Sequence, residues 1–184
     1  PKIRTTALGE LTGTHEANVG VTTIRDTVHY KNLLVNESYT LTGTLMYADT
    51  EEPVLDADGN PYSTSVNFIP TTEDGDALIT YDVPAEDLAG KTIVVYEVLS
   101  RKQSVVASHQ DAADTEQYIY FPKIGTTALA NDTTRQDALA GNIKITDTVA
   151  YENVQVGQTY TVTGTLMDAN SKGYIFTDEE NRTP

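Results

Sequence analysis

Short segments in which apolar and polar residues alternate follow one another along the first two thirds of the chain. The clearest of them cover residues 22–30, 38–47, 63–69, 77–83 and 91–100. Alternation with a period of two is typical of β-strands that bury one face. Turn-forming residues separate them at 56–60 and 73–75, and residues 84–90 predict one helical turn. No segment keeps a helical period, so the pattern predicts an all-β protein built as a β-sandwich.

An internal repeat organises the chain. The segment KIRTTAL that starts at Lys2 returns as KIGTTAL at Lys123, and the segment DTVHY at Asp26 returns as DTVAY at Asp147. The offset is 121 residues for both pairs, which is a usual domain size. We therefore predict a first domain over residues 1–122 and the N-terminal half of a second repeat over 123–184. Because almost no linker separates them, we expect the repeats to stand end to end with restricted bending.

Five polar residues occupy positions where the alternation calls for apolar ones. Thr5 and Asp26 each lie between apolar residues two positions away on both sides, as does Glu97. Gln117 precedes Ile and Phe on its face, and His109 follows Val and Ala on its own. A single exception would indicate a strand end or an edge position. Five together make sense if their side chains meet in the core, because an unpartnered buried acid is costly.

Such a cluster has a coherent chemistry. A threonine hydroxyl becomes a nucleophile when a base takes its proton, and His109 could be that base. Two acids that share a buried site raise one pKa, so one carboxyl stays protonated. That proton could polarise the carboxamide of Gln117. Attack by threonine on glutamine would expel ammonia and leave an ester.

The same residues carry a family resemblance. The matching segments are KIRTT at 2–6, DTVHY at 26–30, YTLTGTLM at 39–46, VVYE at 94–97 and HQD at 109–111 with Gln117. Together they resemble the ester-bond-forming, immunoglobulin-like VaFE repeat domains of Gram-positive surface adhesins. The resemblance covers the whole first repeat and implies tandem immunoglobulin-like sandwiches in the stalk of a cell-surface adhesin.

The resemblance also implies roles for individual residues. Thr5 would be the nucleophile and Gln117 the acceptor of the cross-link, with Asp26 and Glu97 as the acid pair and His109 as the assisting base. Thr6 is the alternative nucleophile by an offset of one. The family pattern has Phe where this chain has Tyr96, on the strand face opposite Glu97, so we expect no effect on the chemistry. In the second repeat, Thr126 and Asp147 would correspond to Thr5 and Asp26, without counterparts of the other three residues.

The composition of the chain limits its binding partners and its location. The chain has no cysteine, which excludes disulfides, and a formal net charge of −15, which argues against nucleic-acid and anionic-membrane binding. No apolar run is long enough for a membrane span. We expect a fragment of an extracellular, cell-wall-anchored protein that uses no cofactor or metal. Its partners would be neighbouring repeats of the same protein, with no host ligand indicated by the residues.

Other functions remain open from the sequence. The module could itself bind a host ligand, or be a lysine–asparagine isopeptide domain with Lys91 turned inward. A turnover hydrolase could also use a histidine, acids and a threonine. The DADGN segment at 56–60 resembles part of a calcium loop, but a hairpin turn fits better because no glutamate follows at the required position. His15 and His29 are expected in a loop and at the surface.

Overall fold

Twelve short elements make up the computed structural model, which describes residues 1–130, 134, 136 and 141–173. The strands of the first repeat are β1 (Lys2–Gly9), β2 (Val21–Lys31), β3 (Tyr39–Tyr47), β4 (Ser63–Phe68), β5 (Gly75–Pro84), β6 (Thr92–Arg101), β7 (Ser104–His109) and β8 (Tyr118–Tyr120). Two 3₁₀ turns, η1 (Ala85–Leu88) and η2 (Thr115–Gln117), precede β6 and β8. The second repeat contributes β9 (Lys123–Ala130) and β10 (Ile145–Glu152). Among the described residues, no helix is long and apolar enough to cross a membrane.

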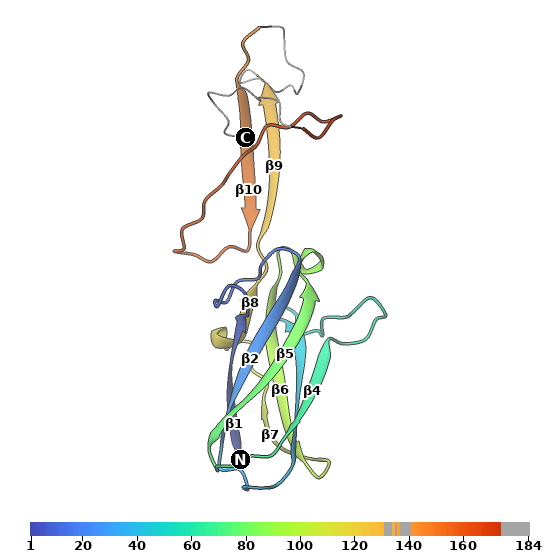
Figure 1. Cartoon of the computed structure of the whole chain (residues 1–184), viewed down its shortest axis with the longest axis vertical. Helices are drawn as coiled ribbons and strands as arrows, with labels where there is room; N and C mark the ends of the chain where they lie inside the picture. Colours follow the sequence, from blue (N-terminus) through green and yellow to red (C-terminus); the bar gives the residue numbers. More distant parts are fainter. Residues whose placement is uncertain (131–133, 135, 137–140, 174–184) are drawn as a thin grey trace.

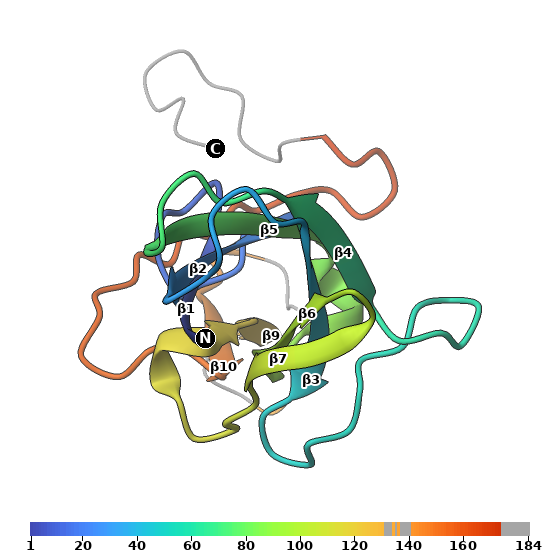
Figure 2. The same cartoon turned by 90° about the horizontal axis from the view of Figure 1, so that it is seen from below.

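The first repeat is a sandwich of two antiparallel sheets. One sheet has the order β1-β2-β5, and the other has the order β4-β3-β6-β7, with β8 paired to β6. Seen end on, the two sheets form opposite layers (Figure 2). The predicted sandwich is therefore confirmed, and all five predicted strands are present with their ends shifted by one or two residues.

The core of the sandwich lies between the two sheets and follows from the alternation. On β1, β2 and β6, every second side chain is buried, which places the apolar residues of both sheets face to face. The largest fully buried apolar side chains come from four strands and two loops: Ile24, Val28, Leu33, Tyr39, Leu41, Leu45, Ile93, Leu99, Ile119 and Phe121. The whole cluster belongs to residues 3–121, so the first repeat has its own core.

A bulge changes one predicted face. The register between β6 and β7 shifts at Leu99 and Ser100, where Leu99 pairs with Ala107 but Ser100 pairs with Val105. The extra residue, Val106, interrupts the alternation. Val105 is therefore exposed, while Ala107 and His109 are half-buried. The prediction that these three side chains share one face was wrong for Val105.

The segment at 56–60 is a hairpin turn. Asp56 Oδ1 accepts hydrogen bonds of 2.9 Å from the backbone N–H groups of Asp58 and Asn60. Gly59 adopts a φ of 82°, a conformation that glycine reaches without strain. A bridge between Leu55 and Pro61 closes the turn. The aspartate therefore organises the backbone, as the hairpin interpretation expected.

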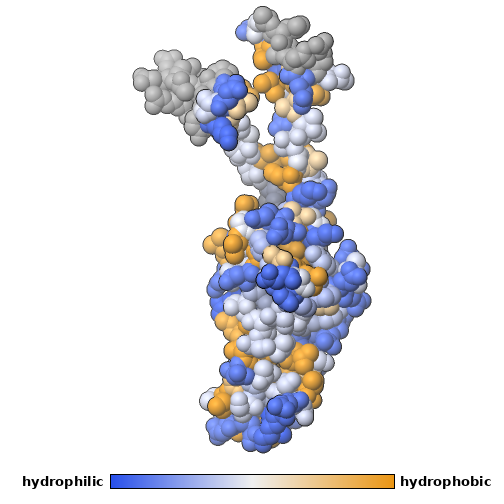
Figure 3. All heavy atoms as spheres, turned by 90° about the vertical axis from the view of Figure 1, so that its right-hand side faces the viewer, coloured by the Kyte–Doolittle hydropathy of each residue, from blue (hydrophilic) through white to orange (hydrophobic). Residues whose placement is uncertain are grey.

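The hairpin of the second repeat reproduces the start of the first. Thr126 pairs with Val149 and Ala128 with Asp147, in the same register as Thr5 with Val28 and Ala7 with Asp26 on β1 and β2. Thr126 and Asp147 are exposed, because no second sheet covers this hairpin among the described residues. The space-filling view shows apolar residues at the surface of this narrow part (Figure 3). Ile124 and Tyr151 of the hairpin are both exposed.

One asparagine joins the hairpin to the sandwich. Asn153 Nδ2 donates to the carbonyl oxygens of Lys91 and Phe121, and Asn153 Oδ1 accepts a 2.9 Å hydrogen bond from Thr92 Oγ1. A second contact joins Tyr160 to Glu16 at 2.9 Å. The hairpin stands on the end of the sandwich along the long axis of the molecule, with the N-terminus at the far end (Figure 1).

Candidate functional site

Four of the five predicted site residues are buried side by side in the core of the sandwich. Thr5 on β1 and Asp26 on β2 come from one sheet, Glu97 on β6 comes from the other, and Gln117 ends η2 just before β8. Each has 0% of its surface exposed. The strand alternation places these residues inward, so their polar side chains meet where an immunoglobulin-like core is otherwise apolar.

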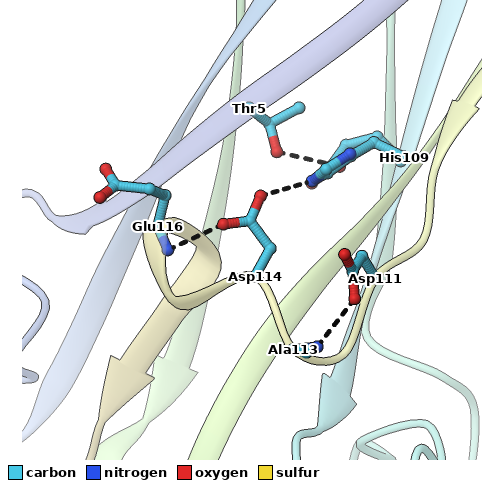
Figure 4. Close-up of polar contacts among 7 residues, drawn as sticks. Thr5, His109, Asp111, Ala113, Asp114 and Glu116 are labelled. Carbon is cyan, nitrogen blue, oxygen red and sulfur yellow. Dashed lines mark hydrogen bonds and ion pairs between the residues drawn. The ribbon is translucent and has the colours of Figure 1, made fainter.

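The threonine hydroxyl is directed at one acid. Thr5 Oγ1 donates a 3.2 Å hydrogen bond to Glu97 Oε2 across the two sheets (Figure 4, dashed line). Thr6 alternates to the other face of β1 and is only half-buried. The geometry therefore favours Thr5 over Thr6 as the residue that faces the cluster.

Burial keeps a proton on the acid pair. Loss of solvent is the main cause that raises the pKa of Glu97 to about 11, and the neighbouring charge of Asp26 adds to it. Burial also raises the pKa of Asp26, although interactions with Glu97 and Gln117 oppose that rise. The pair therefore holds at least one proton at neutral pH, and that proton resides on Glu97.

Several polar atoms of the cluster are buried without a hydrogen bond. These atoms are both carboxylate oxygens of Asp26, Oε1 of Glu97, and Oε1 and Nε2 of Gln117. Asp26 is near enough to Glu97 and Gln117 to influence its pKa, but their atoms are not in hydrogen-bonding geometry. Because an unpaired buried polar atom is costly, these groups are expected to form hydrogen bonds with one another as protons move within the cluster.

His109 borders the cluster and is held by an aspartate. It lies opposite Glu97 in the β6–β7 pairing, and His109 Nε2 donates a 2.9 Å hydrogen bond to Asp114 Oδ2. Figure 4 shows the bond of the imidazole to Asp114. The structure thus brings His109 to the site beside the glutamate that contacts Thr5.

Asp114 is a site residue that the sequence pattern did not reveal. Its Oδ1 accepts a hydrogen bond from the backbone N–H of Glu116, and its carbonyl accepts one from the N–H of Gln117. Asp114 therefore caps η2, which sets the position of Gln117, while its other oxygen orients His109. An aspartate just before a turn is a recognisable capping signal, but its bond to histidine depends on the fold.

Other predicted or alternative residues lie away from the cluster. Lys91 is exposed, with its ammonium 5.8 Å from the ring centre of Tyr47, so the isopeptide alternative lacks its inward lysine. His15 lies in a loop, where its Nδ1 is 2.8 Å from the carbonyl oxygen of Tyr118. His29 is exposed on β2 beside Asp76. Within the described part of the chain, no group of histidines and acids is arranged to hold a metal ion.

Comparison with known proteins identifies a family and a shared fold. The sequence profile of the family described as "T-Q ester bond containing domain" matches residues 1–121 and again residues 122–183. No curated protein matches the chain.

Two crystal forms of a bacterial adhesin from Mobiluncus mulieris, described as containing intramolecular disulfide, isopeptide and ester bond cross-links, share the fold. For the P1 form the TM-score is 0.57 at 16% identity, over 82% of this chain and 76% of that one. For the P21 form the values are 0.56 and 17%, over 82% and 75%. The two profile matches together span nearly the whole sequence, and the chain therefore belongs to the T-Q ester bond containing domain family.

Proposed function

We propose that the protein is a structural stalk module of a bacterial cell-surface adhesin, stabilised by an ester that it forms between its own Thr5 and Gln117. The observation that carries the proposal is the burial of a threonine, an acid pair and a glutamine together in an apolar core. The family profile and the fold shared with a cross-linked adhesin support it.

The reaction needs no group from outside the chain. Thr5 Oγ1 attacks the side-chain carbonyl carbon of Gln117, and its proton passes to Glu97 Oε2, to which the hydroxyl already donates. In the same step, Glu97 gives the proton that it already carries to the carbonyl oxygen of Gln117, so Glu97 stays a neutral acid and the charge that develops on that oxygen is neutralised. The carbon–nitrogen bond then breaks, the nitrogen leaves as ammonia with the proton that came from Thr5, and the re-forming carbonyl group returns its proton to Glu97.

His109 and Asp26 assist this transfer. Asp114 fixes the ring of His109 beside Glu97, where it can return the proton to the departing nitrogen. The unpaired oxygens of Asp26 keep the shared proton on Glu97, because two carboxylates so close together cannot both ionise. The acyl group belongs to the protein itself, so the chemistry happens once and the module is not a turnover enzyme.

The position of the bond suits a load-bearing module. Thr5 lies on the first strand and Gln117 directly precedes the last one, so the ester would close a loop of 112 residues. By analogy with disulfides, a loop of that length stabilises the fold by about 4–5 kcal/mol. Tension applied along the chain would pass through the ester and bypass the strands between its ends.

The partners we propose are neighbouring repeats of the same protein. Residues 1–122 form one complete repeat, and residues 123–184 form the N-terminal half of the next, with Thr126 and Asp147 in the places of Thr5 and Asp26. The contacts of Asn153 with the end of the sandwich support a rod with restricted bending. Such a rod belongs outside the cell on a wall-anchored protein.

Intact mass measurement tests the proposal. Ester formation with loss of ammonia lowers the mass by about 17 Da. Hydroxylamine should then cleave the cross-link, because it attacks esters and leaves amides intact. Thr5→Val should keep the unmodified mass, while the matched Thr6→Val should cross-link as the parent does. An unmodified mass in the folded parent, or full cross-linking of Thr5→Val, contradicts the assignment.

A further inference from the structure

Tyr81 reaches the acid pair from β5. Its neighbour on that strand, Ile79, pairs with Asp26 on β2, and Tyr81 itself pairs with Ile24. Tyr81 is therefore the diagonal neighbour of Asp26 on the same inward face, a distance that an aromatic side chain spans. Tyr81 is 4% exposed, so its ring is part of the core.

A glycine on the opposite sheet makes room for the hydroxyl. Gly43 on β3 is the Cα partner of Glu97 on β6. A Cβ placed on Gly43 would lie 1.7 Å from the Tyr81 hydroxyl oxygen, which no side chain can tolerate. The phenol thus crosses the core from one sheet to the other and ends beside Glu97. The second repeat keeps a glycine, Gly164, at the corresponding position.

The hydroxyl has no partner where it ends. Tyr81 Oη is buried without a hydrogen bond, and so are both oxygens of Asp26 and Oε1 of Glu97. Burial is the main cause that raises the pKa of Tyr81, and the charges of Asp26 and Glu97 raise it further, so the phenol keeps its proton. A buried donor and buried acceptors therefore lie in the same part of the core without a hydrogen bond between them.

We propose that Tyr81 is a positioning residue of the cross-linking reaction, whose hydroxyl donates a hydrogen bond to the carboxylate of Asp26 and so keeps the shared proton on Glu97. The proposal rests on the role proposed above for the acid pair. A hydrogen bond that favours ionised Asp26 leaves Glu97 as the protonated partner. Gly43 is the residue that allows the phenol to reach this place.

The rate of cross-linking in Tyr81→Phe tests this role. The protein is made by cell-free synthesis and collected in denaturant. Dilution refolds it and starts the reaction, and the intact mass measured against time gives the rate. We expect Tyr81→Phe to fold and to cross-link at least about tenfold more slowly, as for the loss of a group that assists proton transfer. Tyr30→Phe is the matched control, because Tyr30 is also a buried tyrosine whose hydroxyl lies against a glycine, but that glycine, Gly75, is its partner within the same sheet. An unchanged rate in Tyr81→Phe overturns the proposal.

Two further measurements separate positioning from packing. In the Thr5→Val background, which cannot react, the titration of the Asp26 carboxyl carbon by NMR should move to higher pH when Tyr81→Phe is added, because the carboxylate loses a donor. Gly43→Ala should slow cross-linking in the parent but add no further loss of rate in Tyr81→Phe. An unmoved titration, or additive losses, would assign Tyr81 to packing alone.

The outcomes distinguish this proposal from the one on which it rests. If the parent never loses ammonia, the ester assignment itself fails. If the parent cross-links, Glu97→Gln does not, and Tyr81→Phe matches the parent, only the role of Tyr81 is contradicted.

Discussion

The Thr5 hydroxyl donates its hydrogen bond to Glu97, a residue 92 positions away on the opposite sheet, at 3.2 Å. The nucleophile of the proposed ester is therefore in contact with a buried carboxyl, while His109 is bonded to Asp114. In the reaction proposed above, Glu97 is therefore the group that contacts the nucleophile directly.

Replacing Glu97 by glutamine should separate folding from cross-linking. Glu97→Gln keeps the shape of the side chain but loses the transferable proton, so we expect a folded domain that cross-links about 10²–10³-fold more slowly. Intact mass against time after refolding measures the loss. Glu116→Gln, a change at an exposed acid next to Gln117, is the control and should react like the parent. If Glu97→Gln cross-links at the rate of the parent, a group other than Glu97 transfers the proton.

The acid pair should make the unreacted protein less stable as pH rises. Glu97 has a pKa of about 11 in the fold against an ordinary value of 4.5, so from about pH 4.5 upward the unfolded chain releases a proton that the folded chain keeps. In Thr5→Val, the free energy of unfolding should then fall by up to about 1.4 kcal/mol per pH unit from this pair.

Urea unfolding of Thr5→Val between pH 5 and pH 9 measures that slope. The double variant Thr5→Val with Glu97→Gln is the matched control, because every other titrating group is the same in both. The difference in slope between the two proteins isolates the acid pair. Equal slopes would mean that Glu97 is ionised in the fold.

Asp114 should affect the reaction and the stability separately. Asp114→Asn keeps a good cap for η2 but loses the charge that orients His109, so cross-linking should slow by about tenfold or more with little change in unfolding free energy. Asp114→Ala removes the cap as well and should cost about 1 kcal/mol in addition. Mass kinetics and urea unfolding of both variants test this. If Asp114→Asn cross-links at the rate of the parent, the orientation of His109 by Asp114 does not contribute to the reaction.

The junction between the repeats should depend on Asn153. Asn153→Gly keeps the positive φ of 55° but removes the hydrogen bonds to the sandwich, so the β9–β10 hairpin should tumble independently. Backbone ¹⁵N relaxation measures this as shorter correlation times for β9 and β10. Asn32→Gly is the matched control, since Asn32 has a φ of 58° at the equivalent, exposed position. Equal tumbling in both variants would place the rigidity elsewhere.

The alternation of the strands predicted most of the site. Thr5, Asp26, Glu97 and Gln117 were each assigned inward because their neighbours two positions away are apolar, and all four are buried. That inference works because strand period depends only on local geometry. Alternation predicts which side chains enter the core, and the internal repeat predicts where the second copy of the pattern begins.

The remaining features depend on contacts between sheets, which alternation does not contain. In the sequence, Tyr81 is one more aromatic residue of the core and Gly43 a glycine within a strand. Their contact depends on how the two sheets pack against each other. Asp114 lies in a loop without periodicity. The bulge at Val106 is invisible in the pattern, because it depends on how β7 pairs with β6.

The shared register of the two hairpins has a geometric consequence. Because β9 and β10 repeat the pairing of β1 and β2 residue for residue, a single rotation combined with a translation relates one hairpin to the other. Asn153 fixes that operation at the junction, and Asn32 presents the same turn at the opposite end. Any repeats joined in this way would follow one screw axis, so the direction in which each repeat faces would be set by its number along the rod.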